Sequence, residues 1–161
     1  MSSRIVYPQA QVAELISDEV SRRYLCLEGL PARNVLFLPE RSPRPIKIGQ
    51  PSVPYVDIGR TTTGTIIGLH PATGEVVAIY EPVSGKAWHA NANLEKFVSS
   101  IQEFDDRAPF YAGTMTDQQL ERSALDLAAR LTDIDPTSLR DEHGFWAGLV
   151  FDVGLGDYSD L

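Results

Sequence analysis

Histidines and glycine-rich loops are the first places to look for chemistry in this sequence, because they supply metal ligands, general bases and phosphate cradles. The histidines are His70, His89 and His143, and no two stand at the i, i+4 spacing of a helical metal pair. The string 89–93, HANAN, superficially resembles a metal-nuclease motif but lacks its second histidine. The segment 59–64, GRTTTG, lacks the Lys-Ser/Thr pair of a phosphate loop. The sequence therefore predicts no catalytic site, no metal and no cofactor.

Nucleophilic residues and paired acids also lack the spacing of a catalytic site. No serine lies in a Gly-x-Ser-x-Gly elbow, and the single cysteine, Cys26, is expected as a small buried side chain on a helix. Carboxylates are adjacent at 105–106 and 141–142, but neighbouring side chains point apart and are typical of a solvated face. A small hydrolase stays open as an alternative only if the fold brings His89 or His143 against a carboxylate in a cleft.

Negative charge is concentrated in the C-terminal third of the chain. The 161 residues include 14 basic and 22 acidic side chains, a formal net charge of −8. Residues 1–100 hold 10 basic and 9 acidic residues, whereas residues 101–161 hold 4 and 13. This balance argues against nucleic-acid binding and favours faster encounter with a basic partner or, alternatively, solubility alone. No apolar run is long enough for a signal peptide or a membrane span, so we expect a cytoplasmic protein without membrane contact.

One domain, residues 1–161, is expected from the length and from the absence of repeats or low-complexity linkers. Near its start, residues 17–27 predict a helix, with Ser17 as the cap and Gly29 as the stop. Residues 9–15 fit either a helical turn or a short strand.

Short apolar runs in the middle of the chain predict an antiparallel meander, because strands separated by tight turns pair with their sequence neighbours. A strand at 35–38 is followed by five prolines within residues 39–54, which predict an ordered loop with a short extended piece at 46–48. The remaining strands are expected at 55–58, 65–69, 75–80 and 86–90, with turns at 70–74 and 82–85.

Helices are expected in the rest of the chain. Residues 93–103 predict a helix capped by the asparagine at its start, and Thr116 with Gln119 forms a capping box for the next helix. The pair 135–136, Asp-Pro, signals one more helix start, and the tail 154–161 is expected to be exposed. We therefore expect an α+β fold, with a central, largely antiparallel sheet flanked by N- and C-terminal helices.

The order of these elements is similar to that of a known family. The pattern begins with residues 25–31, LCLEGLP, at the end of a helix, followed by a strand and a proline-broken loop with Ile48-Gly49. It continues with a strand that contains Asp57 and a turn at Thr73-Gly74. It ends where Asn93-Leu94 opens a helix that contains Phe97. Over roughly residues 20–104 it resembles the SUKH superfamily, and within it the fourth bacterial subgroup. Phe145-Trp146 resembles the C-terminal aromatic position of that family.

The resemblance implies an immunity protein of a bacterial polymorphic toxin system, with an α+β fold and no catalytic constellation. Such a protein binds a cognate toxin domain, often a nuclease or deaminase, and blocks it in the cytoplasm of the producer. A non-catalytic adaptor or regulatory module that binds another cytoplasmic protein is the alternative.

Acidic residues of the C-terminal third are our candidates for a toxin-binding surface, because enzymes acting on nucleic acid carry a basic groove that an acidic patch complements. Phe110 and Tyr111 are candidate aromatic anchors. The alternative is that the aromatic residues belong to the core and the carboxylates only solvate the surface. The acidic candidates are Glu103, Asp105, Asp106, Asp117, Glu121, Asp141 and Glu142.

Overall fold

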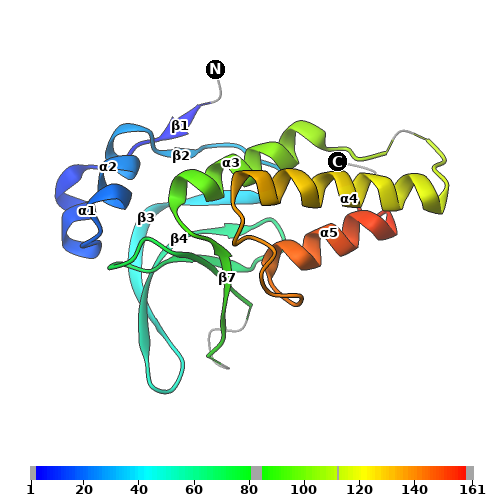
Figure 1. Ribbon diagram of the computed structural model, residues 1–161. Coiled ribbons are helices and arrows are strands. Elements are labelled where there is room, and N and C mark those ends of the chain that lie inside the picture. Colours follow the sequence, from blue (N-terminus) through cyan, green and yellow to red (C-terminus); the bar gives the residue numbers. More distant parts are fainter. Residues whose placement is uncertain (1–2, 81–84, 112, 159–161) are drawn as a thin grey trace.

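A five-stranded antiparallel sheet forms the centre of the computed structural model, which describes residues 3–80, 85–111 and 113–158 (Figure 1). The strands are ordered β3-β4-β5-β6-β7, so each pairs with its neighbour in sequence, as predicted for a meander. Their bounds are Phe37–Ile48 for β3, Val53–Thr61 for β4, Ile66–Leu69 for β5, Val76–Ile79 for β6 and Ala87–Asn91 for β7.

Within the described residues, five helices accompany this sheet, two before it and three after it. The helices α4 and α5 lie side by side at one end of the molecule and α1 and α2 at the other, and α3 runs between them in contact with both α2 and α4 (Figure 1). Each helix in the described part is too short or too polar to cross a bilayer. The predicted α+β fold, with a central antiparallel sheet and helices at both ends, is confirmed. The bounds are Gln9–Leu15 for α1, Glu19–Leu27 for α2, Leu94–Arg107 for α3, Asp117–Ile134 for α4 and Phe145–Leu155 for α5, with a small sheet of β1, Arg4–Ile5, and β2, Leu30–Pro31.

The proline-rich segment is a strand and not the predicted loop. β3 contains Pro39, Pro43 and Pro45 and pairs with β4, with a register shift between Pro39 and Arg44. β3 is an edge strand, and one row of backbone N–H groups on an edge strand needs no partner in the sheet. Proline is tolerated there, so the prediction of a loop over 39–54 was wrong because it ignored where the strand lies in the sheet.

The N-terminal helices differ from the prediction in one cap. Residues 9–15 form a helix, α1, and not a short strand. Asp18 and not Ser17 caps α2, because the Asp18 carboxylate accepts a hydrogen bond from the backbone N–H of Ser21 at 2.8 Å. Ser17 instead donates its hydroxyl to the carbonyl oxygen of Pro71 at 3.1 Å, which ties the start of α2 to the turn between β5 and β6.

The predicted caps of α3 and α4 are confirmed. Asn93 accepts a hydrogen bond from the backbone N–H of Lys96 at 2.9 Å. Thr116 and Gln119 make the reciprocal hydrogen bonds of a capping box. The turn predicted at 82–85 lies largely outside the described residues.

Two expectations about the end of the chain were wrong. Asp135 does not start a helix; it is the C-cap of α4, and turns connect it to α5. Residues 154–158 of the predicted tail are not simply exposed, because α5 continues to Leu155 and the Tyr158 ring packs edge-on against Phe104 with centroids 5.0 Å apart; residues 159–161 lie outside the described residues. The backbone N–H of Phe110 also donates to the carbonyl oxygen of Tyr158 at 3.1 Å.

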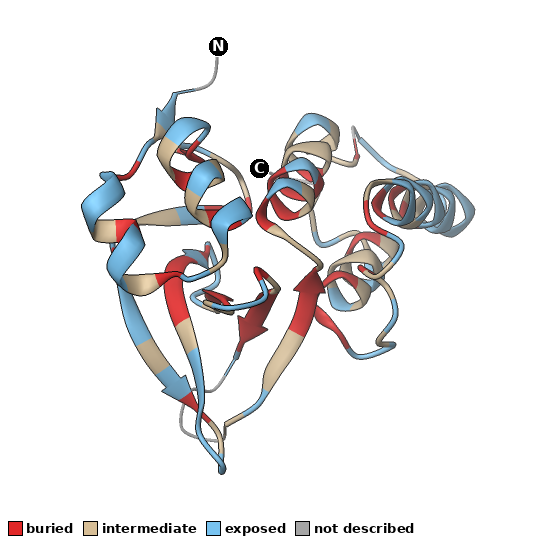
Figure 2. Cartoon of the chain, turned by 60° about the vertical axis from the view of Figure 1, so that its left-hand side comes forward, coloured by how far each residue is buried: buried red, intermediate tan, exposed pale blue. Residues whose placement is uncertain are grey.

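The main hydrophobic core lies where the helices face the sheet (Figure 2). Phe37 of β3 and Phe97 of α3 meet edge to face with ring centroids 5.4 Å apart, and Trp146 of α5 is fully buried. Cys26 packs against the same core, but it is only partly buried.

Candidate functional site

Asp135 is the centre of a buried hydrogen-bond network that joins segments distant in sequence. Its side chain is fully buried and accepts from the backbone N–H of Ala92 at 2.8 Å and from the side-chain amide of Asn91 at 3.0 Å. The backbone N–H and the hydroxyl of Thr137 donate to its other oxygen at 3.0 and 2.8 Å, and Lys96 Nζ lies 3.6 Å from that oxygen. Burial acts to raise the pKa of Asp135, but the hydrogen bonds outweigh burial and lower the pKa from 3.8 to about 2. The charged carboxylate thus holds the end of α4 against β7 and the start of α3.

His89 contacts a carboxylate, which is the arrangement that the hydrolase alternative requires. Its Nδ1 lies 2.5 Å from Glu75 Oε1, and its Nε2 lies 2.8 Å from Thr137 Oγ1. Hydroxyl, imidazole and carboxylate therefore follow one another as in a hydrolase triad. Here the Thr137 hydroxyl donates to Asp135, Arg140 binds Glu75 at 3.0 Å, and His89 is only 9% exposed. Because the Thr137 hydroxyl already donates its hydrogen to Asp135, it cannot also donate it to His89. The geometry therefore supports a structural role for Thr137 and not the role of a nucleophile.

Three of the predicted acidic residues lie near the end of α3, and two of them, Glu103 and Asp105, are half-buried and hydrogen-bonded within the fold. Glu103 accepts a hydrogen bond from Arg107 at 2.6 Å, which lowers the pKa of Glu103 against the opposing effect of burial. Asp105 accepts from the backbone N–H of Val35 at 2.8 Å. Asp106 is exposed. Of these three carboxylates, Asp106 is therefore the one most available to a partner.

The other acidic candidates lie near the two ends of α4. Asp117 and Glu121 are exposed on its first turns, whereas Asp141, half-buried, and Glu142, exposed, lie in the turn before α5. An α-helix of 18 residues, the length of α4, spans about 27 Å. The structure therefore does not gather the acidic candidates at one point.

The two aromatic candidates are turned toward the core. Tyr111 is buried, and Phe110 is half-buried with its ring centroid 4.8 Å from that of Phe104. Their packing is that of core residues, and only part of Phe110 is accessible.

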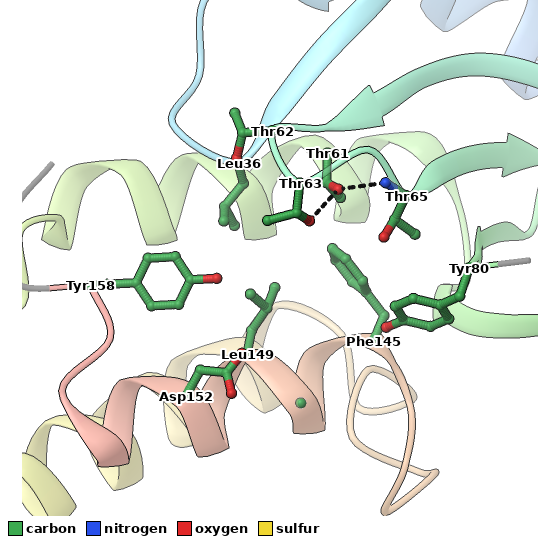
Figure 3. A pocket seen from close by; sticks show the side chains of 11 residues that line it. Leu36, Thr61, Thr62, Thr63, Thr65, Tyr80, Phe145, Leu149, Asp152 and Tyr158 are labelled. Carbon is green, nitrogen blue, oxygen red and sulfur yellow. Dashed lines mark hydrogen bonds between the residues drawn. The ribbon is translucent and has the colours of Figure 1, made fainter.

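A pocket of about 240 Å³ opens beside α5, where the sequence predicted no candidate (Figure 3). Asp152 of α5 lies on one wall, and the phenol oxygens of Tyr80 and Tyr158 point into the pocket from opposite sides (Figure 3). Threonines at the end of β4 and in the turn after it line the facing wall, where the Thr61 and Thr63 hydroxyls lie 2.9 Å apart. The pocket thus combines one carboxylate with several hydroxyl groups, which suits a cationic hydrogen-bond donor.

Large apolar side chains are exposed on the same helix and on its neighbour. Phe151 and Leu155 of α5 are 65% and 60% exposed, and Leu125 of α4 is 63% exposed. The helices α4 and α5 pack together, and these side chains lie on their solvent side. We call Glu121, Leu125, Phe151 and Leu155 the helical face. Exposed apolar area beside charged residues is typical of protein-binding surfaces.

Comparison with known families decides how these features are interpreted. A model of the SUKH-4 immunity protein family matches residues 3–152. The chain belongs to the SUKH-4 immunity protein family. Searches of curated proteins and of solved structures returned no match. The resemblance to the SUKH superfamily is confirmed, and the SUKH-4 match also includes α4 and most of α5. Membership supports an immunity role with a protein partner.

Sequence reasoning missed both Asp152 and the Asp135 network of this SUKH-4 protein. Asp152 carried a usable signal, because it is the sole charged residue in the apolar helix FWAGLVFDVGL. The long-range contacts of Asp135 carried none, because its partners Asn91 and Ala92 lie 44 and 43 residues away in sequence.

Proposed function

We propose that this SUKH-4 protein binds a cognate toxin domain in the cytoplasm and neutralises it by covering it, without catalysing a reaction. The family match over residues 3–152 is the observation that carries the proposal. The saturated hydrogen bonds of His89 and Thr137 support its non-catalytic part. We take residues 1–161 as one binding domain that needs no cofactor.

A toxin that cleaves or edits nucleic acid is the partner we propose. Such an enzyme carries a basic groove for phosphates, and residues 101–161 of this chain hold 13 acidic against 4 basic residues. Opposite charges raise the rate of encounter, whereas a few well-packed contacts set the rate of dissociation. The acidic residues therefore serve capture, and the apolar residues serve retention.

The helical face is the surface that we propose for this contact. Exposed apolar side chains also occur on α2, at Val20 and Leu27, where the charges of Arg22 and Arg23 are offset by those of Glu19 and Glu28. The α2 surface therefore lacks the excess of negative charge that residues 101–161 carry, so charge favours the helical face for a basic toxin. Of the residues predicted from the sequence, the exposed carboxylates of Asp106, Asp117, Glu121 and Glu142 remain the proposed charged contacts.

Co-expression with the neighbouring reading frame tests the proposed function. We expect the chain to restore growth of cells that produce the toxin domain and to co-purify with it. Growth arrest despite soluble expression of both proteins, or purification of the two apart, would contradict the proposal. Co-purification with a housekeeping protein instead of a toxin would favour the adaptor alternative.

A further inference from the structure

The pocket beside α5 has room for one side chain of a bound protein. Its volume of about 240 Å³ lies below the roughly 300–1,000 Å³ typical of small-molecule sites. Tyr80 at its edge is 48% exposed and Gly148 is exposed, so the pocket opens to the surface. A Cβ atom added at Gly148 would meet no atom within 4 Å. A side chain of a bound protein can therefore enter the pocket from outside.

Asp152 gives the pocket a negative charge that nothing in the described part of the chain neutralises. None of the ion pairs among the described residues includes Asp152, and none of the lining residues found there is basic. Burial raises the pKa of the Asp152 carboxyl, and the nearby Asp157 raises it further. Burial also raises the pKa values of Tyr80 and Tyr158, and the charge of Asp152 adds to both shifts. The pocket is thus built around a carboxylate that has no cationic partner among the residues that the structure describes.

A guanidinium group matches this environment better than an ammonium group does. It is planar, carries five N–H donors, pairs with a carboxylate through two parallel hydrogen bonds and stacks on aromatic rings. The pocket offers the Asp152 carboxylate, the phenol oxygens of Tyr80 and Tyr158, threonine hydroxyls and the ring of Phe145 (Figure 3). An ammonium group concentrates three donors at one point and cannot use the flat aromatic surface in the same way.

We propose that this pocket receives the side chain of one arginine of the bound toxin and pairs its guanidinium with Asp152. The inference rests on the proposed function and adds a specific contact to it. Phe151 and Leu155 of the helical face belong to the same helix, α5, as Asp152 and the exposed Gly148, so one partner can cover the helical face and also reach the pocket. An arginine held in this way is withdrawn from the phosphate groove of the toxin, so the pocket contributes to inhibition as well as to affinity.

Two variants and one control separate the pocket from general effects on the protein. Asp152→Asn removes the charge and keeps the shape. Gly148→Leu keeps the charge of Asp152 and places a side chain in the pocket from a position on α5 where there is open space for it. Leucine is also a better helix former than glycine. Asp126→Asn removes one negative charge from an exposed position on α4 outside the pocket and serves as the matched control. Thermal unfolding checks that all three variants fold.

Titration of the isolated protein with N-acetyl-arginine methylamide, followed by amide NMR shifts, tests the chemistry of the pocket. We expect saturable shifts at pocket residues such as Thr63, Gly148 and Leu149. Asp152→Asn and Gly148→Leu should weaken this binding about tenfold, and Asp126→Asn less than about twofold. The neutral analogue N-acetyl-citrulline methylamide should produce no saturable shifts. Absence of shifts at the pocket, equal shifts with the citrulline analogue, or equal binding by Asp152→Asn and Asp126→Asn would overturn the proposal.

The affinity of the toxin domain separates failure of the pocket from failure of the proposed function. We expect Asp152→Asn and Gly148→Leu each to raise the Kd about tenfold or more, and Asp126→Asn to change it less than about threefold. If the toxin binds wild type and both pocket variants equally tightly, the pocket inference is wrong and the proposed function stands. If the toxin does not bind wild type at all, the proposed function itself is wrong.

Discussion

The indole N–H of Trp146 donates a hydrogen bond to the side-chain oxygen of Asn91 across 2.9 Å, and both residues are fully buried. This bond connects α5 to β7. Asn91 at the same time donates to Asp135 at 3.0 Å, so α5 and the end of α4 are fixed to the sheet through one amide group. The helical face and the pocket owe their position to this connection.

Replacement of Asn91 by alanine should therefore weaken the whole C-terminal half. The substitution leaves the buried Trp146 N–H without an acceptor and removes one donor from Asp135, so we expect the free energy of unfolding to fall by about 2–3 kcal/mol. Urea denaturation measures this change. The double variant with Trp146→Phe completes a cycle in which the two losses should not add. Strict additivity would show that the bond contributes little.

Asp135 should make stability depend on acid pH. Its pKa falls from 3.8 to about 2 on folding, so the folded state favours the charged form more than the unfolded chain does. The resulting stabilisation, about 2 kcal/mol, is fully present above pH 4 and is lost as the pH falls toward 2. Urea denaturation between pH 2 and pH 6 should show this loss in wild type and not in Asp135→Asn, which should be less stable than wild type at neutral pH. Parallel profiles for the two proteins would contradict the assignment.

Replacement of Gly29 should lower the free energy of unfolding more than replacement of Gly64, although both glycines have a positive φ. Gly29 has φ +72°, and a Cβ atom there would lie 2.3 Å from the carbonyl oxygen of Ile5 in β1. Gly64 has φ +95° and open space around it. We expect Gly64→Ala to lose about 1 kcal/mol of unfolding free energy through backbone strain, and Gly29→Ala to lose more than about 3 kcal/mol. Equal losses in denaturant would mean that β1 can move aside.

Asp152→Asn should stabilise the free protein at neutral pH. Because the pKa of Asp152 is raised on folding, its ionised form opposes folding above that pKa, and the amide removes this effect. We expect a gain below about 1 kcal/mol, given the partial exposure of the side chain, and convergence with wild type as the pH falls toward 3. Glu103→Gln is the contrasting variant: the pKa of Glu103 is lowered by Arg107, so this substitution should destabilise at neutral pH. A loss of melting temperature in Asp152→Asn at pH 7 would contradict the description of the pocket.

Charge reversal on the surface should slow capture of the toxin. We expect Asp106→Lys with Asp117→Lys and Glu121→Lys to reduce the association rate and to flatten its dependence on salt, because long-range attraction is removed. Asp105 is left intact because it accepts the Val35 N–H. Stopped-flow or surface-plasmon kinetics at two salt concentrations measure the effect.

The matched control for this reversal lies on the N-terminal helices. Lysine substitutions at the exposed residues Glu14 of α1, Glu19 of α2 and Glu28, the C-cap of α2, change the net charge by the same amount. We expect them to slow association less than the reversal near α4. Equal slowing by both sets would show that net charge, and not the position of the charge, governs encounter.

Local hydrogen bonds account for what the sequence could predict. The caps at Asn93 and Thr116 involve partners three residues away, so their pattern is visible in the sequence itself. The strand through Pro43 was missed because its tolerance of proline depends on lying at the edge of the sheet. The pocket was missed because its residues are distant in sequence: Tyr80 and the threonines at 61–65 lie on one side, and Asp152 and Tyr158 come from the end of the chain. Only the fold brings such residues together.

The stoichiometry of inhibition tests the central claim most directly. A fixed amount of purified toxin domain is titrated with this SUKH-4 protein, and residual toxin activity is measured at each ratio. A protein that neutralises by binding should reach full inhibition at about one molecule per toxin molecule, and the toxin should regain activity when the complex is dissociated. Full inhibition at a small fraction of that ratio, or a toxin left chemically altered after separation, would contradict the account and show that the protein acts as an enzyme.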